Sequence, residues 1–354
     1  MMNDMDFRNI ALSHAEKYPL MQAQDYVKLA YQSAFGAGHM VSGFENALAR
    51  VKAERTRETE SVSSEDIGGG YVRLHLSGGE YPLSSETAAR MFVLSAEPVP
   101  ECKNKFFAYS EILLSLAGEG AIRPAQSEIH ASLQKFTSGD FSPVSHTDIY
   151  RENYHPAYRV IKKAFSDNLP LISRLDALKQ KKNGAIIAID GMCAGGKTTL
   201  SSLLGAVFAS PVYHMDDFFL PPSKRTEKRL SEPGGNVDYE RFRSDVLDPL
   251  LSGKPFSFRP FDCSIMDFAS PVLCGPSPLS IVEGSYACHP TLIHDYDFRI
   301  FVSVDPALQL ERIRLRNGEG MLKRFVSEWI PMEMRYFDVF SIPEKADYII
   351  KSEG

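Results

Sequence analysis

The stretch at residues 186–200, IIAIDGMCAGGKTTL, combines three glycines, a lysine and two threonines in an order that can bind phosphate. Gly191–Thr198 fits the pattern G-x-x-x-x-G-K-[ST] without a gap. Glycines let successive backbone N–H groups point at phosphate oxygens, and a following helix adds its own N–H groups and dipole. Lys197 can reach the β- and γ-phosphates, and the Thr198 hydroxyl can ligate Mg²⁺. The pattern predicts a nucleotide site formed by Gly191, Met192, Cys193, Ala194, Gly195, Gly196, Lys197, Thr198 and Thr199, with a glycine-rich turn beside a surface lysine as the alternative.

Carboxylates end two other apolar segments. Asp216 and Asp217 end PVYHMDD (211–217), and Glu283 ends PLSIVE (278–283). If both segments are parallel strands, their carboxyl ends lie at the same edge of the sheet as the phosphate loop. An aspartate there can accept the proton of an attacking hydroxyl, and Glu283 can hold Mg²⁺ or its waters. Asp216, Asp217 and Glu283 could instead be ordinary turn carboxylates.

The elements that must position these residues are short, β-branched segments in the second half of the chain. They are nearly all apolar, as buried parallel strands are, and helical patterns separate several of them. The predicted strands span 185–190, 211–216, 278–284, 298–304 and 346–350. We therefore expect an α/β fold over residues 184–354, with a mostly parallel sheet.

Before residue 182, most segments space their apolar residues three and four apart, which predicts helices. The predicted helices span 23–35, 43–58, 103–118 and 153–165, with a connecting helix over 169–184. One alternating segment, YVRLHL at 71–76, predicts a strand. We expect a mainly α-helical accessory domain over residues 1–180, preceding the α/β domain.

Composition limits the class of protein and its partners. The 354 residues have a formal net charge of −6, which argues against a nucleic-acid partner bound through its phosphates. Five scattered cysteines without a C-x-x-C pair favour reduced thiols over a zinc site. No apolar run approaches the ~20 residues that span a bilayer, and the first residues do not resemble a secretory leader. We expect a cytoplasmic protein without a membrane partner.

Taken in order, these motifs resemble the uridine kinase and phosphoribulokinase branch of the P-loop kinases. The resemblance covers residues 184–354 and rests on the phosphate loop followed by HMDDFF, GGNVDYERF, FRPFD, IVEGSY and KADYII. It implies a P-loop kinase domain that uses ATP and Mg²⁺ to phosphorylate a hydroxyl of a small metabolite, a nucleoside or ribose-like acceptor. It also implies that Asp216, rather than Asp217, is the catalytic base.

Two features bear on the acceptor. In this family an acid at the place of Asp238 grips ribose hydroxyls, although the residue alone could equally be a helix N-cap. In FDCSIMDF (261–268), Phe261 keeps the start of the family's pyrimidine-recognising segment, whereas Met266 and Phe268 replace a histidine and an arginine. A thioether is a weak hydrogen-bond acceptor. We therefore expect Asp238 and Phe261 to bind a ribose-like acceptor, and uridine and cytidine to be poor substrates.

The segment RNGEGMLKRF (316–325) places glycines between basic residues. In the family a lid at this place closes over ATP, and its arginines stabilise the transferring phosphate. Guanidinium groups match phosphoryl oxygens, and glycines permit hinge motion. Of Arg312, Arg314, Arg316 and Arg324, we choose Arg316 and Arg324, which bracket the break, as catalytic. The alternative is a solvated helix face.

Other hypotheses remain open for the whole chain and for its first half. A nucleotide-dependent switch or ATPase acting on a protein partner would also need the phosphate loop. The first half could be a separate catalytic unit, but its histidines show no metal-binding spacing. Its aromatic segments AYQSAFGAGHMV (30–41) and YHPAYRVI (154–161) are expected to pack in a core or in the contact of a homo-oligomer, rather than to line a ligand pocket.

Overall fold

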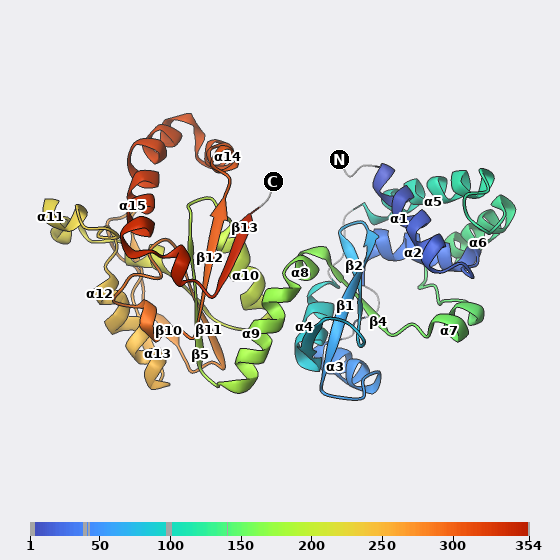
Figure 1. Ribbon diagram of the computed structural model, residues 1–354, viewed down its shortest axis with the longest axis horizontal. Helices are drawn as coiled ribbons and strands as arrows, with labels where there is room; N and C mark the ends of the chain where they lie inside the picture. Colours follow the sequence, from blue (N-terminus) through green and yellow to red (C-terminus); the bar gives the residue numbers. More distant parts are fainter. Residues whose placement is uncertain (1–3, 38–40, 42, 97–100, 140, 353–354) are drawn as a thin grey trace. The chain divides into compact units, whose positions relative to one another are not determined.

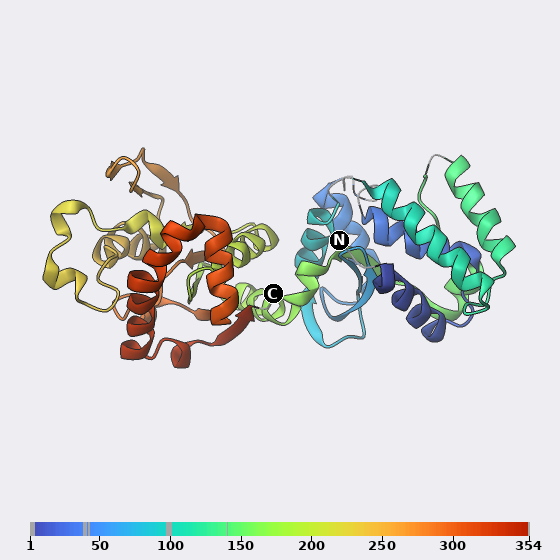
Figure 2. The same cartoon turned by 90° about the horizontal axis from the view of Figure 1, so that it is seen from above.

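The chain divides into two compact units, Met1–Ala177 and Leu178–Gly354. The computed structural model describes residues 4–37, 41, 43–96, 101–139 and 141–352. Figures 1 and 2 show the elements of each unit from two directions. Within these described ranges, no helix combines the length and the apolar composition needed to cross a bilayer.

A five-stranded parallel sheet forms the centre of the C-terminal unit. Its order is β13-β12-β5-β11-β6, and every neighbouring pair is parallel. All seven residues of the central strand β5 are buried, because helices and loops cover both of its faces. The strands are β5 (Ala185–Gly191), β6 (Val212–His214), β11 (Leu279–Glu283), β12 (Phe298–Val304) and β13 (Tyr348–Ser352). The predicted α/β fold with a parallel sheet is confirmed.

Helices and small antiparallel pairs surround this sheet. The helices are α9 (Leu169–Lys181, which contains the boundary between the units), α10 (Lys197–Phe208), α11 (Glu227–Leu230), α12 (Tyr239–Phe242), α13 (Asp248–Ser252), α14 (Pro306–Arg324) and α15 (Ile330–Phe340). The antiparallel pairs are β7 (Phe256–Phe258) with β10 (Val272–Cys274), and β8 (Phe261–Asp262) with β9 (Asp267–Phe268). Single turns include η1 (Met215–Phe218), η2 (Pro222–Lys224) and η5 (Phe325–Trp329).

The N-terminal unit packs helices around a four-stranded antiparallel sheet of order β3-β1-β2-β4. The strands are β1 (Thr59–Gly68), β2 (Tyr71–His75), β3 (Tyr81–Ser84) and β4 (Tyr158–Lys162). The helices are α1 (Asp4–Lys17), α2 (Ala23–Phe35), α3 (Phe44–Ala53), α4 (Ser85–Leu94), α5 (Cys102–Gly118), α6 (Gln126–Ser138), α7 (Asp148–Tyr154) and α8 (Lys163–Asp167). The expected mainly helical unit is therefore present, and the predicted strand at 71–76 is β2.

One helix prediction in this unit was too long at its C-terminal end, and another was wrong. The predicted helix 43–58 ends at Ala53, and β1 begins at Thr59. The predicted helix 153–165 contains the end of α7, strand β4 and the start of α8. Pro156 interrupts the helix, and the β-branched and aromatic residues after it pair with β2, with Val160 opposite Arg73. Residues 38–40 of the aromatic segment 30–41 lie outside the described residues.

Candidate active site

The phosphate-loop sequence connects the end of β5 to the start of α10 at the centre of the parallel sheet. Gly191 has φ 136°, and a Cβ there would lie 2.1 Å from the carbonyl oxygen of Val302 on β12. Gly196 has φ 97° and is the N-cap of α10. Glycine is therefore required at both positions, once for close backbone approach and once for a left-handed conformation. The loop ends where the free N–H groups of α10 begin.

Lys197 folds back over this loop. Its side chain is buried, and Nζ donates hydrogen bonds to the carbonyl oxygens of Gly191 (2.6 Å) and Met192 (3.0 Å). Nζ also lies 3.3 Å from Oγ of Ser285, which follows β11. These three acceptors hold the Lys197 ammonium group beside the glycine-rich loop.

Side chains of the last helices hold the loop from outside. Glu333 on α15 accepts hydrogen bonds from the backbone N–H of Cys193 (2.9 Å) and from the Ser285 hydroxyl. Gln309 on α14 donates to the carbonyl oxygen of Cys193 at 2.9 Å. Sequence reasoning missed Glu333, Ser285 and Gln309, because nothing in their local sequence indicates that they reach the loop.

Thr198 and Glu283 lie together at the carboxyl ends of β5 and β11. The Thr198 hydroxyl donates to Oε1 of Glu283 at 3.4 Å, and Nδ1 of His214 lies 2.6 Å from the same oxygen. The hydrogen bond with Glu283 raises the pKa of His214. A hydroxyl beside a carboxylate is a donor set that Mg²⁺ accepts, because this ion keeps several waters and needs few protein ligands. Among the described residues there is no cluster of three or more acidic, histidine or cysteine ligands.

Asp216 and Asp217 lie on the η1 turn that follows β6. The Asp216 side chain is exposed, whereas Asp217 is partly buried. Desolvation by the surrounding protein raises the pKa of Asp216; the charge of Glu283 raises it further, and Lys197 opposes both effects. Asp216 is thus within electrostatic reach of both Lys197 and Glu283. Burial also raises the pKa of Asp217, and Arg241 binds the backbone oxygen of Asp217 at 2.9 Å.

Asp238 is the N-cap of α12, the role that its residue type alone allowed. Its Oδ1 accepts a hydrogen bond from the backbone N–H of Arg241 at 3.2 Å. Its Oδ2 accepts one from Nζ of Lys224 at 2.8 Å. The Asp238 side chain is almost wholly buried, whereas Lys224 is half exposed on η2. Oδ2 is thus bound by the ammonium of a half-exposed side chain, and Nε of Arg241 lies 3.9 Å from the same oxygen.

Phe261 is buried on β8 and packs edge-on against Phe268 of β9, with ring centroids 5.5 Å apart. Met266 lies in the turn between these strands, is exposed, and has φ 54°. The guanidinium of Arg241 lies 5.1 Å from the Phe268 ring and 4.0 Å from the Phe218 ring. The segment predicted to contact the acceptor is thus an aromatic hairpin beside Arg241, and Phe261 supports it from within.

The predicted lid arginines occupy α14 and its break. Gly318 interrupts the helix with φ 78° and ψ 168°, where a hinge was expected. Arg316 is exposed and donates to Asn317, and Arg324 pairs with Glu328 at 3.0 Å. The partners of both arginines, Asn317 and Glu328, lie outside the phosphate loop. Arg312, which sequence reasoning did not select, donates to the carbonyl oxygen of Ala194 at 3.3 Å.

Asp190, the last acid before the loop, is the principal buried group that sequence reasoning did not assign. Its carboxylate accepts hydrogen bonds from the backbone N–H groups of Gly191 (2.7 Å) and Cys288 (2.9 Å) and from the Tyr336 hydroxyl (2.9 Å). Complete burial raises its pKa to about 6. The local signal was an acid inside an otherwise apolar strand. Asp190 joins β5, the segment after β11 and α15 into one rigid base for the loop.

Comparisons with known proteins give similarity in structure only. No protein-family model and no curated protein matches the chain. A solved structure described as a possible uridine kinase from Bacillus stearothermophilus is 20% identical, covers 51% of this chain and 98% of its own, and has a TM-score of 0.40. A putative fructose transport system kinase from Silicibacter sp. TM1040 is 22% identical, covers 49% and 97%, and has a TM-score of 0.39. Shikimate kinase from Bacteroides thetaiotaomicron is 15% identical, covers 48% of this chain and 86% of its own, and has a TM-score of 0.26.

The fold of the C-terminal unit follows from its own geometry. A wholly parallel sheet carries a glycine loop and a helix N-terminus at the end of its central strand. Carboxylates follow two of the other strands, one of them in contact with Thr198. In fold, this half of the chain is an α/β domain with a glycine-rich loop between the central strand of a parallel sheet and the helix that follows it.

Proposed function

We propose that the protein is a kinase that transfers the γ-phosphate of ATP to a hydroxyl of a small, ribose-like metabolite. The observation that carries this proposal is the grouping of Lys197, Thr198, Glu283 and Asp216 at one edge of the parallel sheet. We further propose that residues 184–354 are the kinase domain and residues 1–180 an accessory domain. Transfer from ATP, together with reduced cysteines, fits a cytoplasmic enzyme.

Each side chain has a role in this proposal. Asp216 accepts the proton of the acceptor hydroxyl, whose oxygen then attacks the γ-phosphorus as the bond to the β-phosphate oxygen breaks and ADP leaves. A raised pKa brings Asp216 closer to the basicity that a general base needs. Lys197 leaves its carbonyl partners and stabilises the charge on the phosphates. When bound at Thr198 and Glu283, Mg²⁺ would neutralise phosphate charge.

Lid closure completes the site in this proposal. The break at Gly318 permits the second part of α14 to swing, which would carry Arg324 toward the phosphates. Arg312 already lies at the loop and needs only a side-chain movement. Both arginines match the charge that develops on the transferred phosphoryl group.

On the acceptor side, Asp238 offers two carboxylate oxygens that can accept hydrogen bonds from vicinal hydroxyls once Lys224 moves. The hairpin of Phe261, Met266 and Phe268 lacks side chains that recognise a pyrimidine edge. We therefore infer a primary hydroxyl on a ribose-like or similarly polyhydroxylated metabolite as the acceptor. Uridine and cytidine should be poor substrates.

The test is an ATP-dependent screen of purified protein against nucleosides, nicotinamide riboside, pantothenate and sugar phosphates. ADP release that requires one of these acceptors and disappears in Lys197→Ala would support the kinase. Uridine with the highest kcat/KM would overturn the acceptor inference and leave the kinase standing. Binding of ATP without turnover of any acceptor would favour a nucleotide-dependent switch.

A further inference from the structure

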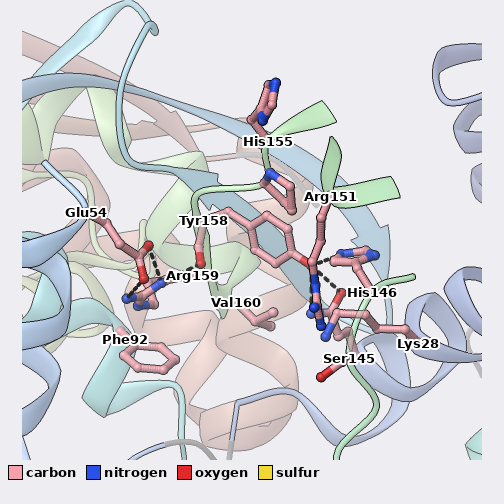
Figure 3. A pocket seen from close by; sticks show the side chains of 12 residues that line it. Lys28, Glu54, Phe92, Ser145, His146, Arg151, His155, Tyr158, Arg159 and Val160 are labelled. Carbon is pink, nitrogen blue, oxygen red and sulfur yellow. Dashed lines mark hydrogen bonds and ion pairs between the residues drawn. The ribbon is translucent and has the colours of Figure 1, made fainter. Parts of the chain in front are cut away.

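The N-terminal unit contains a pocket of about 590 Å³ whose lining includes none of the candidate active-site residues. Residues of α2, α7 and β4, and of the segments that precede β4, line it (Figure 3). Its volume is within the range that holds small-molecule ligands. The segment YHPAYRVI, expected to pack in a core or an oligomer contact, supplies His155, Pro156, Tyr158, Arg159 and Val160 to its wall.

The lining carries more positive than negative charge. Lys28, Arg151 and Arg159 face Glu54 as the single carboxylate among the lining residues. Glu54 is bound by Arg159 through two hydrogen bonds of 2.9 and 2.8 Å. Lys28 and Arg151 therefore have no carboxylate partner within the lining. This positive excess is notable in a chain whose net charge is −6.

Charged groups behind the lining reduce this excess but leave it positive. Asp25 bonds to Nδ1 of His146 at 2.9 Å and to the Thr147 hydroxyl at 2.7 Å, both uncharged partners, so its negative charge acts on Lys28. Glu65 is bound by Lys17 and lies 3.5 Å from the buried guanidinium of Arg73. Outside the pocket, Asp148 lies 3.3 Å from Arg151 but is largely solvated, so it screens the arginine weakly.

Lys28 is the cation of the lining that is held by an uncharged partner. Its Nζ donates to the carbonyl oxygen of Val144 at 2.5 Å. Burial, reinforced by the charge of Arg73 and opposed by that of Asp25, lowers the pKa of Lys28 to about 8. An ammonium in these surroundings gains stability when an anion approaches it, because the anion opposes the cost of burial and the repulsion from Arg73.

The wall around Lys28 is rigid before any ligand binds. Nε2 of His146 lies 2.6 Å from the Tyr158 hydroxyl, and the His146 ring stacks on Tyr150 at 3.9 Å. Burial lowers the pKa of His146 to about 4, so this imidazole is neutral at neutral pH. A fixed wall reduces the entropy lost when a ligand binds.

The two ends of the pocket differ in charge. Figure 3 shows the Lys28 and Arg151 side chains on the same side as His146 and Ser145, with Phe92 and the Glu54–Arg159 pair on the opposite side. Phe92 is 2% exposed, and the guanidinium of Arg159, which is paired with Glu54, lies 5.6 Å from its ring. A ligand that suits both ends has a compact anionic head, and a planar body that can lie against the Arg159 guanidinium.

We propose that this pocket binds a phosphate monoester, with Lys28 and Arg151 on the phosphate and the remainder of the molecule toward Phe92 and the Glu54–Arg159 pair. A lysine and an arginine fork together supply more donors than one carboxylate accepts, whereas a phosphate has three free oxygens and close to two charges. Nothing in this site depends on the phosphate loop of the other unit.

The test measures acetylation of Lys28 by an amine-specific reagent at pH 8 in the full-length protein. With a pKa of about 8, Lys28 is half deprotonated there and reacts readily. Peptide mass spectrometry reports this lysine separately from the exposed Lys135, which serves as the internal reference. The probes are inorganic phosphate, phenyl phosphate and benzoate, at ionic strength held constant with chloride.

We expect inorganic phosphate and phenyl phosphate to slow acetylation of Lys28 relative to that of Lys135. Phenyl phosphate should do so at a lower concentration than inorganic phosphate, and benzoate should have almost no effect. Arg151→Gln should raise the half-protecting concentration of phenyl phosphate about tenfold, as loss of one charged hydrogen bond predicts. Arg123→Gln, at an exposed arginine of the same unit outside the pocket, should leave it unchanged. Benzoate protection equal to that of phenyl phosphate would overturn the phosphate assignment. Unchanged Lys28 reactivity with every probe would overturn the site.

Discussion

The ammonium of Lys224 lies 2.8 Å from Oδ2 of Asp238, a carboxylate that also caps α12 through its other oxygen. The pair closes the place where a ribose-like acceptor is proposed to bind. A ligand hydroxyl that binds Oδ2 must displace an ammonium, so acceptor binding and movement of η2 are linked. The cap, by contrast, needs only a neutral oxygen at Oδ1.

Asp238→Asn separates these two roles. Asparagine keeps an oxygen that can cap the helix. It loses the negative charge that attracts Lys224, and it also loses the second oxygen that could accept a hydrogen bond from a ligand hydroxyl. We expect the KM for the acceptor to rise about tenfold or more, with the KM for ATP unchanged, in steady-state kinetics. The control is Asp305→Asn at the N-cap of α14, which should alter neither constant. An unchanged acceptor KM in Asp238→Asn would limit Asp238 to capping.

Lys197→Ala should lower kcat by at least about 10²-fold, because it removes a positioned charge from the transferring phosphate. The loop should persist, since Glu333 and Gln309 hold it through Cys193. Circular dichroism melting checks the fold, and Lys254→Ala, at an exposed lysine of the same unit, is the matched control. Full activity in Lys197→Ala would remove the nucleotide-site assignment.

Asp216→Asn should lower kcat by roughly 10²–10⁴-fold with little effect on nucleotide affinity, because it removes the proton acceptor. In the wild type, the acid limb of kcat should lie at higher pH than for an ordinary aspartate, because the pKa of Asp216 is raised and the base works only when ionised. Asp217→Asn is the comparison. If that change proves the damaging one, the base is the second aspartate.

Gly318→Ala tests the hinge. At φ 78° and ψ 168° a side chain is strained by on the order of 1–3 kcal/mol, although no atom lies within 4 Å of the added Cβ. We expect kcat to fall severalfold and the nucleotide-dependent fluorescence change of Trp329, the single tryptophan, to shrink. Gly320→Ala adds a Cβ in equally open space without a positive φ, and should behave as the wild type. Equal behaviour of the two variants would exclude Gly318 as the hinge.

Asp190 makes the stability of the C-terminal unit depend on pH with a definite sign. Its folded pKa of about 6 exceeds the ordinary value of 3.8, so between these pH values the folded state binds the additional proton. The contribution of Asp190 to the free energy of unfolding therefore falls as pH rises from about 4 to about 6, by on the order of 2–3 kcal/mol.

Urea titrations followed by Trp329 fluorescence measure this effect as the difference between the wild type and Asp190→Asn across that pH range. The asparagine variant loses hydrogen bonds at every pH but cannot titrate. The stability difference between the two proteins should therefore narrow as pH rises. A difference independent of pH would show that Asp190 keeps the same proton occupancy on unfolding.

The glycine-rich loop between β5 and α10 and the fold class of the C-terminal unit were predictable from sequence because their signals are local. Gly191, Gly196, Lys197 and Thr198 lie within one turn between a strand and a helix, so their spacing along the chain is also their spacing in the fold. The strands β5, β11 and β12 are mostly apolar and mostly buried, as strands of a covered parallel sheet are. Helices α2 and α5 were predictable for the same reason, since their periodicity is contained in the helix itself.

The tertiary structure decided the features that depend on partners far along the chain. Strand β4 forms because β2 offers it a hydrogen-bonding edge, and no pattern within residues 153–165 contains that edge. Glu333 and Arg312 contact the loop from helices more than a hundred residues away along the chain. In the N-terminal unit, His146 and Asp25 are likewise more than a hundred residues apart and form a hydrogen bond. Such contacts arise only when the chain folds back on itself, because side-chain direction and burial are set by packing and not by neighbours in sequence.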